Sequence, residues 1–431
     1  MCRYTRPPMA ASVFEDLTWR GLIANSTDPG TLREALAAGS AVFYCGFDPT
    51  APSLHFGNLV QLVTMRRLQL AGHRPIAVVG GATGLIGDPS GRNEERSLNT
   101  TDVVAAWVDR IRPQVERYLA FEGENAARVV NNLEWTGPMR AIDLLRDVGK
   151  HFSVSRMLAK EAVDARLAAG GISYTEFSYQ ILQALDYLEL YRRYACTLQT
   201  GGSDQWGNLT AGVDLIRRVE GVAVHALATP LLTKSDGSKY GKTAEGTLWL
   251  DPEVSSPFAF YQYFLNQADA DVGGLLRVFS FRSHEEIEEL ERSAKERPEE
   301  RAAQLALAGE LTALVHGEEA VEEAVAASRA LFGEGDLASL DARTMEAAVA
   351  EVPRTTVEPG EELPPLIDLA VASGLFESRG SAKQAIAQGG LYVNNRRVAD
   401  GVASLTRGDL LHGRWLLLRR GKRTLAAIEV R

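Results

Sequence analysis

One segment of the sequence places a histidine, a glycine and an asparagine where they could bind a nucleotide. It reads Asp48-Pro-Thr-Ala-Pro-Ser-Leu-His55-Phe-Gly57-Asn58 and directly follows a short apolar run. Glycine at the N-terminus of a helix lets a phosphate approach the backbone, and His and Asn one turn apart can bind its oxygens. The HxGN pattern is weak alone, but a strand-to-helix junction is where such a site is expected.

A second segment, Thr233-Lys-Ser-Asp-Gly-Ser-Lys239-Tyr-Gly-Lys242-Thr243, carries two lysines three residues apart in a glycine-rich stretch. Ammonium groups at this spacing suit a polyphosphate, because they can follow the charge that develops on a departing pyrophosphate. The segment is not a Walker A loop, since the spacing between Gly237 and Gly241 is one residue too short. The alternative to a polyphosphate site is a basic surface turn.

Three polar residues define a possible binding stripe on one predicted helix. Tyr179, Gln183 and Asp186 stand at i, i+4 and i+7, so a helix places them on one face. Apolar residues around the rest of the helix predict that it is packed on both sides. The stripe suits a small polar ligand, and the alternative is a half-buried polar seam between helices.

Two further glycine-rich segments add acidic and basic side chains. Gly201-Gly-Ser-Asp204-Gln205-Trp-Gly-Asn208 again joins a predicted strand to a helix, where Asp204 suits the hydroxyls of a ribose. Gly80-Gly-Ala-Thr-Gly-Leu-Ile-Gly-Asp88-Pro-Ser-Gly91-Arg92 supplies Asp88 and Arg92, and Arg96 follows it. Each segment is only moderately specific by itself.

Strands and helices alternate in the first half of the chain, and the motifs fall at their junctions. This alternation predicts a parallel sheet covered by helices on both faces, with ligands bound beyond the carboxyl ends of the strands. Between the second strand and the next helix, 81–91 is predicted to be a loop. The predicted strands are Ala41–Phe47, Pro75–Gly80, Ala127–Asn131 and Cys196–Thr200, and the predicted helices are Leu59–Ala71, Asp102–Phe121 and Pro138–Val148.

The second half of the chain divides into a helical part, a linker and a small mixed part. Amphipathic stretches between 256 and 341 predict helices, and 351–365, with four prolines and many acids, predicts a linker. Beyond it, helices are expected at Leu366–Gly374 and Ser381–Gln388 and strands at Leu391–Val398 and Arg414–Arg419. The predicted organisation is an α/β domain at 1–245, a helical domain at 246–350, a linker at 351–365 and an α+β domain at 366–431.

Charge is distributed unevenly along the 431 residues. The whole chain has a net charge of −10, but 364–431 holds 11 Lys and Arg against 5 Asp and Glu, which leaves −16 for the rest. A basic end on an acidic body indicates a nucleic-acid contact surface, and a solvated charged face is the alternative. The three cysteines lack zinc-site spacing and no apolar run is long enough for a membrane span, so a cytoplasmic protein is expected.

Taken in this order, the motifs resemble those of the bacterial tyrosyl-tRNA synthetases, a family of class I aminoacyl-tRNA synthetases. The resemblance extends from Trp19-Arg-Gly-Leu-Ile to the S4-type RNA-binding pattern SRGSAKQAIAQGGLYVNN, which begins at Ser378. His55-Phe-Gly-Asn58 stands at the place of the HIGH signature, and Lys239-Tyr-Gly-Lys242-Thr243 at that of KMSKS. The resemblance implies a Rossmann-like catalytic domain, an all-helical domain on the anticodon side and a small S4-like tRNA-binding domain.

The resemblance also implies a role for each matching residue. Tyr44 and Asp186 would bind the phenol hydroxyl of tyrosine, and the remainder of that amino acid would be held by Asp88, Tyr179, Gln183 and Gln205. ATP would be bound by Gly46, Asp48, Thr50, His55, Gly57, Asn58, Gly202, Asp204 and Lys242. The implied catalytic residues are His55 and Asn58, which would contact the ATP phosphates, and a second group that would stabilise the departing pyrophosphate: Lys239, Lys242, Thr243, Arg92 and Arg96.

The implied reaction joins L-tyrosine to ATP, which enters with Mg²⁺, and then transfers tyrosine to the 3′-terminal adenosine of tRNA(Tyr). The resemblance further implies a homodimer and no tightly bound cofactor. Two positions depart from the family, because Asn58 replaces the second histidine of HIGH and Arg92 stands where lysine is common. The rivals are a tryptophanyl relative, a nucleotidyltransferase with an HxGH-like site, and an RNA-binding protein that has lost catalysis.

Overall fold

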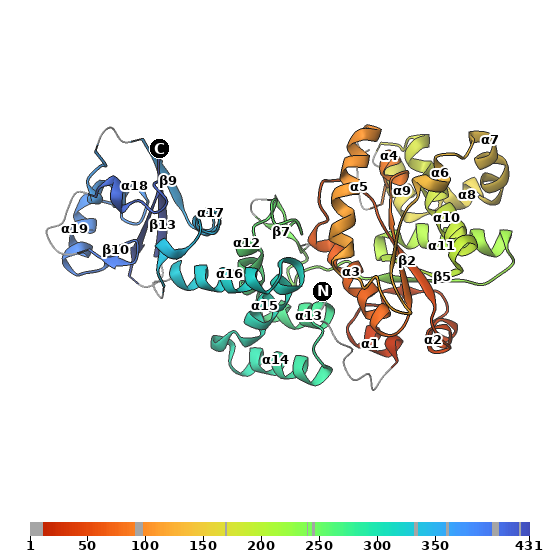
Figure 1. The fold of residues 1–431 in the computed structure, drawn as a ribbon, viewed down its shortest axis with the longest axis horizontal. Coiled ribbons are helices and arrows are strands. Elements are labelled where there is room, and N and C mark those ends of the chain that lie inside the picture. Colours follow the sequence, from red (N-terminus) through yellow and green to blue (C-terminus); the bar gives the residue numbers. More distant parts are fainter. Residues whose placement is uncertain are drawn as a thin grey trace. The chain divides into compact units, whose positions relative to one another are not determined.

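The computed structural model describes residues 12–90, 98–168, 170–238, 240–243, 246–331, 335–358, 362–398, 405–421 and 424–431. These residues form two compact units (Figure 1). The first unit lies within Met1–Val254 and Ala268–Ala303, and the second within Ser255–Gln267 and Gln304–Arg431. No helix of the described residues is long and apolar enough to cross a membrane.

A six-stranded sheet in the order β1-β6-β5-β2-β3-β4 forms the centre of the first unit. All neighbouring strands are parallel except the pair β1 and β6, which confirms the predicted parallel sheet. Strand β3 is buried at every position except its first, as expected where helices cover both faces. The strands are β1 (Asn25–Ser26), β2 (Val42–Phe47), β3 (Arg74–Val79), β4 (Arg128–Asn131), β5 (Cys196–Gly202) and β6 (His225–Thr229).

Helix α10 (Tyr174–Tyr194) packs with α11 (Trp206–Val219) and carries the predicted polar stripe. It begins where the hydroxyl of Ser173 accepts the backbone N–H of Glu176 at 3.2 Å. It ends at Ala195, whose φ of 53° is left-handed. The other helices before the second signature are α1 (Val13–Trp19), α2 (Pro29–Ala37), α3 (Phe56–Leu70), α4 (Thr83–Ile86), α5 (Thr101–Glu116), α6 (Leu133–Thr136), α7 (Ala141–Asp143), α8 (Val154–Leu158) and α9 (Glu161–Ala168).

Two predicted elements of this unit differ in detail. The predicted loop 81–91 contains the single helical turn α4, in which the N–H of Gly84 donates to the carbonyl of Gly80 at 2.7 Å. This turn packs closely, since a Cβ at Gly84 would lie 2.9 Å from Pro49. The predicted helix Pro138–Val148 begins only at Ala141 and continues as a π-helical turn over Leu144–Val148.

The remaining elements of the first unit follow the lysine segment. A short hairpin pairs β7 (Lys242–Thr243) with β8 (Gly246–Thr247). Two helices come later, α13 (Asp269–Phe279) and α14 (His284–Glu296). They belong to the first unit, so the helical stretch predicted for 246–350 is shared between the two units.

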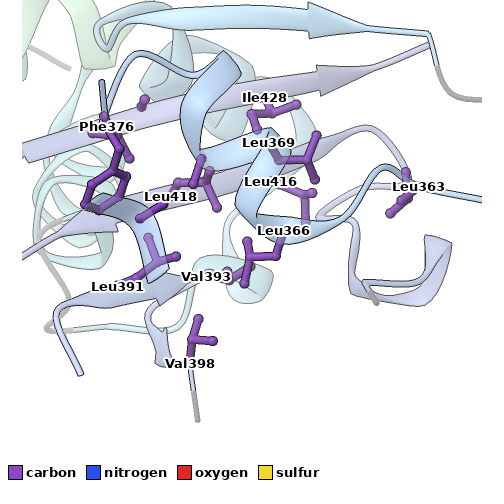
Figure 2. Close-up of a cluster of buried hydrophobic side chains, with 14 of the residues drawn as sticks. Leu363, Leu366, Leu369, Phe376, Leu391, Val393, Val398, Leu416, Leu418 and Ile428 are labelled. Atoms are coloured by element: carbon purple, nitrogen blue, oxygen red, sulfur yellow. The ribbon is translucent and has the colours of Figure 1, made fainter. Parts of the chain in front are cut away.

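The second unit joins helices to a five-stranded sheet in the order β11-β10-β12-β13-β9. Its strands are β9 (Arg354–Val357), β10 (Leu391–Val393), β11 (Arg396–Arg397), β12 (Trp415–Arg420) and β13 (Thr424–Val430), and its helices are α12 (Pro257–Leu265), α15 (Ala302–His316), α16 (Glu318–Leu331), α17 (Ala342–Ala350), α18 (Leu366–Ala372) and α19 (Arg379–Ala387). Figure 2 shows its core, where Leu366 and Leu369 of α18 share one apolar cluster with Leu416 and Leu418 of β12.

Two predictions for this sheet are wrong. The stretch 351–365 is not all linker, because it contains β9, which pairs in parallel with β13. The predicted strand Leu391–Val398 is a hairpin that turns at Asn394 and Asn395, where φ is 47° and 64°. Asparagine tolerates this left-handed conformation, so the pair NN is a turn signal.

Candidate active site

A cavity of about 610 Å³ opens at the carboxyl ends of the parallel strands of the first unit. Its wall includes Phe47 at the end of β2, Gly202 at the end of β5 and Thr229 at the end of β6. This is the position that the strand-helix alternation predicts. The predicted site residues that line the cavity are Tyr44, Gly46, Asp48, Thr50, His55, Gly57, Asn58, Asp88, Tyr179, Gln183, Asp186, Gly202, Asp204 and Gln205.

The predicted phosphate-binding cations are described only in part. Arg92, Arg96 and Lys239 lie outside the described residues. Lys242 and Thr243 are described by their backbone alone, as the two residues of β7. Tyr240 and Gly241, which directly precede them, line the cavity.

One end of the cavity holds a buried carboxylate beside a buried phenol. Asp186 accepts hydrogen bonds from Asn132 Nδ2 at 3.0 Å and from Trp135 Nε1 at 2.8 Å. Burial raises the pKa of the Asp186 carboxyl to about 7, although these two hydrogen bonds lower it. Burial and the nearby Asp186 charge raise the pKa of the Tyr44 hydroxyl well above its usual value.

The Tyr44 hydroxyl is buried and has no hydrogen-bond partner among the described residues. The same holds for the side-chain oxygen of Gln183, which lies on α10 one turn before Asp186. A buried polar atom without a partner is costly, so both atoms mark places where a ligand would complete the hydrogen bonding. With Asp186 beside it, the Tyr44 hydroxyl suits a ligand group that both donates and accepts.

A second carboxylate, that of Asp48, connects three elements around the cavity. It accepts from the Tyr179 hydroxyl of α10 at 2.6 Å and from the Thr83 hydroxyl of α4 at 2.6 Å. Burial and the Asp48 charge hold the pKa of the Tyr179 hydroxyl well above its usual value. Gly80 must be glycine here, because a Cβ would overlap the side chains of Asp48 and Thr83.

Asp88 lies at the centre of a group of polar side chains. It accepts from Gln205 Nε2 at 2.5 Å, from the backbone N–H of Ser90 at 3.0 Å and from Asn208 Nδ2 at 3.5 Å. Together, Asp48 and Asp88 make this part of the cavity acidic, which suits a cationic group such as an ammonium.

The HFGN segment forms the N-terminus of α3. The backbone N–H of His55 donates to the side-chain oxygen of Asn58 at 3.0 Å, so Asn58 helps to fix the start of the helix. A Cβ at Gly57 would lie 2.8 Å from the His55 ring, so glycine leaves room for the imidazole. The positive end of the α3 dipole favours an anionic group in this part of the cavity.

The HFGN segment is paired with the chain that follows the lysine hairpin. The N–H of Phe56 donates to the carbonyl of Leu248 at 2.9 Å, and the N–H of Leu250 donates to that of Leu54 at 2.8 Å. The N–H of Asp251 also donates to the Ser53 hydroxyl at 3.1 Å. Residues 53–56 and 248–251 therefore bring the two signatures to one end of the cavity.

The sequence did not point to every residue around the cavity. It missed Asn132 and Trp135, which hold Asp186, and Thr83, which holds Asp48. It also missed Trp249, whose ring meets the His55 ring edge-on at 6.3 Å between centroids. Within the described residues, no group of three or more His, Cys, Asp or Glu side chains could hold a metal ion.

Two family models match the chain. The model for class I tRNA synthetases of the tryptophan and tyrosine type matches residues 37–333. The model for the SYY-like C-terminal domain of tyrosine–tRNA ligase matches residues 344–428. The second match covers β9, β10, β11 and β12 and most of β13 of the C-terminal sheet.

Known relatives match nearly the whole chain. The tyrosine–tRNA ligases of Streptomyces avermitilis and Streptomyces griseus are each 60% identical over 420 residues, which is 97% of this chain and 99% and 98% of theirs. A C-terminally truncated mitochondrial tyrosyl-tRNA synthetase from Aspergillus nidulans has a TM-score of 0.68 at 28% identity, over 74% of this chain and 94% of that one. The chain therefore belongs to the class I tRNA synthetases, among the tyrosine–tRNA ligases.

Proposed function

We propose that the cavity performs both steps of the tyrosine–tRNA ligase reaction. L-Tyrosine and ATP give tyrosyl-adenylate and pyrophosphate, and the tyrosyl group then passes to the 3′-terminal adenosine of tRNA(Tyr). The observation that carries this assignment is the Tyr44 hydroxyl, which is buried beside the carboxylate of Asp186 and finds no hydrogen-bond partner in the described part of the chain. A tyrosine phenol would satisfy both groups, whereas phenylalanine would leave them buried and unpaired.

The amino acid would lie along α10. Its phenol would reach Tyr44 and Asp186, while its ammonium would lie at the acidic part of the cavity. We assign the ammonium to Asp88, Tyr179 and Gln183 and the carboxyl region to Gln205. The side-chain oxygen of Gln183 supports this direction, because an ammonium would supply the donor that the described residues do not.

ATP is the nucleotide substrate of class I tRNA synthetases, and we propose that it enters as its Mg²⁺ complex. The tyrosine carboxylate attacks the α-phosphorus, and the bond to pyrophosphate breaks. Thr50, His55 and Asn58 would bind the phosphates at the start of α3. Gly46, Asp48, Gly57, Gly202 and Asp204 complete the proposed ATP contacts, and Lys239, Lys242, Thr243, Arg92 and Arg96 would stabilise the pyrophosphate.

The parts of the chain would divide this work. We propose that 1–245 catalyses, that 246–350 faces the anticodon side of the tRNA and that 366–431 binds the tRNA backbone. Exposed basic side chains on the C-terminal sheet and its helices support the last assignment; they include Arg379, Lys383, Arg396, Arg397 and Arg420. We place the reaction in the cytoplasm, where tRNA is charged for translation.

We further propose a homodimer, formed through α7, α8 and the π-helical turn between them. Four large apolar side chains there are exposed to solvent, Ile142 by 67%, Leu145 by 53%, Val154 by 61% and Leu158 by 41%. A second copy of the chain would cover them.

Ile142→Asp should therefore convert a dimer to a monomer in sedimentation equilibrium, whereas Leu305→Asp, at an exposed position of α15, should leave it dimeric. A wild-type monomer would contradict the proposal.

The reaction is tested by amino-acid-dependent exchange of pyrophosphate into ATP, measured with tyrosine, tryptophan and phenylalanine. Exchange with tyrosine alone is expected, and Asp186→Ala should abolish it. Asp214→Ala removes an exposed carboxylate of α11 and should leave the exchange unchanged. Exchange with tryptophan would overturn the assignment of the pocket while leaving the fold intact.

A further inference from the structure

The chain leading to the second signature forms a tight turn of its own. The N–H of Lys234 donates to the carbonyl of Ser238 at 2.8 Å, and the N–H of Gly237 to that of Lys234 at 2.9 Å. The side chain of Asp236 accepts the N–H of Ser238 at 2.8 Å. Gly237 has a φ of 82°, which glycine adopts without strain. These hydrogen bonds tie residues 234–238 to one another.

This turn is fastened to a helix that lies well beyond it in the sequence. The backbone N–H of Ser235 donates to Asp271 Oδ1 at 2.9 Å. Asp271 is the third residue of α13, and its side chain is half-buried. The contact joins residues 36 apart and reaches the turn at its tip.

The far end of α13 is held firmly by the body of the first unit. Buried Arg20 donates to the carbonyls of Arg277 at 3.0 Å and Ser280 at 2.9 Å. Buried Arg67 of α3 donates to the carbonyl of Ser280 at 2.5 Å. Guanidinium groups at a helix C-terminus satisfy its unpaired carbonyls and oppose its dipole.

Helix α13 also touches the first signature. The ring of Phe279, its last residue, lies 4.8 Å from the ring of Phe56, the residue after His55. A Cβ at Gly241, in the second signature, would lie 3.2 Å from Phe56. One helix therefore contacts the start of α3 at one end and the turn before Lys242 at the other.

We propose that Asp271 is a positioning residue for tyrosine activation. Its carboxylate holds the 234–238 turn by accepting the N–H of Ser235. The position of this turn then determines where β7, and with it Lys242, begins. The inference rests on the proposed role of Lys242 at the pyrophosphate. Asp271 itself touches no substrate, and its effect depends on an oxygen acceptor rather than on negative charge.

The test compares three variants in tyrosine-dependent pyrophosphate exchange. Asp271→Ala should lower kcat about fivefold, as expected from the loss of a single hydrogen bond, and leave the KM for tyrosine unchanged. Asp271→Asn keeps an oxygen at the same place and should restore kcat to within about twofold. Glu288→Ala removes an exposed carboxylate from the neighbouring helix α14 and should have no effect.

Two outcomes would overturn the proposal. If Asp271→Ala has wild-type kcat, the contact does not position the signature. If Asp271→Asn is as slow as Asp271→Ala, charge and not the hydrogen bond is responsible. Lys242→Ala is measured beside them. If Lys242→Ala keeps the wild-type kcat, the proposed role of Lys242 is rejected. If Lys242→Ala lowers kcat but Asp271→Ala does not, only the positioning role of Asp271 is rejected. Equal melting temperatures for all variants confirm that folding is not the cause.

Discussion

Asp186 is held in one orientation before any substrate binds. Each of its oxygens already accepts an N–H, one from Asn132 and one from Trp135, so the carboxylate cannot rotate freely. It offers its remaining lone pairs to the cavity as a fixed acceptor. Burial nevertheless raises its pKa to about 7, which places its titration within the working range of an enzyme.

This pKa predicts how tyrosine recognition depends on pH. Above about pH 7 the ionised carboxylate accepts the phenol hydroxyl, and below it the protonated carboxyl loses part of that capacity. We therefore expect the KM for tyrosine to rise about tenfold between pH 8 and pH 6, as for a single group of this pKa. The measurement is pyrophosphate exchange across this range. The KM for ATP serves as the control and should not follow the same curve; a flat KM for tyrosine would contradict the prediction.

At the scale of residues, the sequence predicted one side of each contact. The i, i+4, i+7 spacing predicted that Tyr179, Gln183 and Asp186 share a face of α10, because helical geometry is local. It could not predict that Asn132 meets Asp186 or that Asp48 meets Tyr179. Such partners come from separate elements, so they are known only once the sheet and helices have packed.

At the scale of elements, a buried ion pair joins α9 to the first turn of α10. Arg166 Nη2 lies 2.9 Å from Glu176 Oε2, and both side chains are almost fully buried. Arg166→Ala would leave the Glu176 carboxylate buried without its cation. We expect this change to lower the free energy of unfolding of the first unit by about 3 kcal/mol. Urea unfolding followed by tryptophan fluorescence measures the loss.

An exposed pair of the same kind is the control. Arg217 and Asp214 on α11 are 3.0 Å apart, but 61% and 47% of their side-chain surfaces are exposed. Arg217→Ala should cost less than about 1 kcal/mol, because water screens the pair and solvates the remaining charge. Equal losses for Arg166→Ala and Arg217→Ala would show that burial does not set the cost.

Elements with strong apolar patterns could be predicted, and those defined by pairing could not. Strand β2 begins one residue after its predicted start, and α3 begins three residues before its own. Strand β9 was missed because prolines flank it and its burial alternates at an edge of the sheet. Its parallel partner β13 lies about seventy residues later, and no local pattern reveals such a pairing.

At the scale of the whole molecule, β9 decides where the C-terminal part can be removed. Removing residues 364–431 would leave β9 in place without its partner β13. Ending the chain after Ala350 instead removes the whole five-stranded sheet. We expect a chain ending at 350 to keep tyrosine activation and to raise the KM for tRNA at least about tenfold. Pyrophosphate exchange and tRNA charging, measured on one preparation, separate the two effects.

Salt dependence checks that the lost affinity is electrostatic. Binding of tRNA to the full chain should weaken steeply with added salt, and the truncated chain should show a smaller slope, since fewer phosphates are neutralised. The double change Arg379→Ala and Lys383→Ala on exposed α19 should give an intermediate slope. Identical slopes for full and truncated chains would exclude the C-terminal sheet from the tRNA contact.

The pairing of 53–56 with 248–251 also bears on how fast the enzyme becomes active after it begins to fold. Its contacts join residues as far as 198 apart, whereas the turns of α3 and α10 close over four. Closing so long a loop lowers the chain entropy before the contacts that stabilise the closed loop have formed. Local helices therefore form first. On dilution from denaturant, the helical circular dichroism signal should therefore return before pyrophosphate exchange does. The nucleotide end of the cavity is assembled late, from parts of the chain that a ribosome delivers far apart in time.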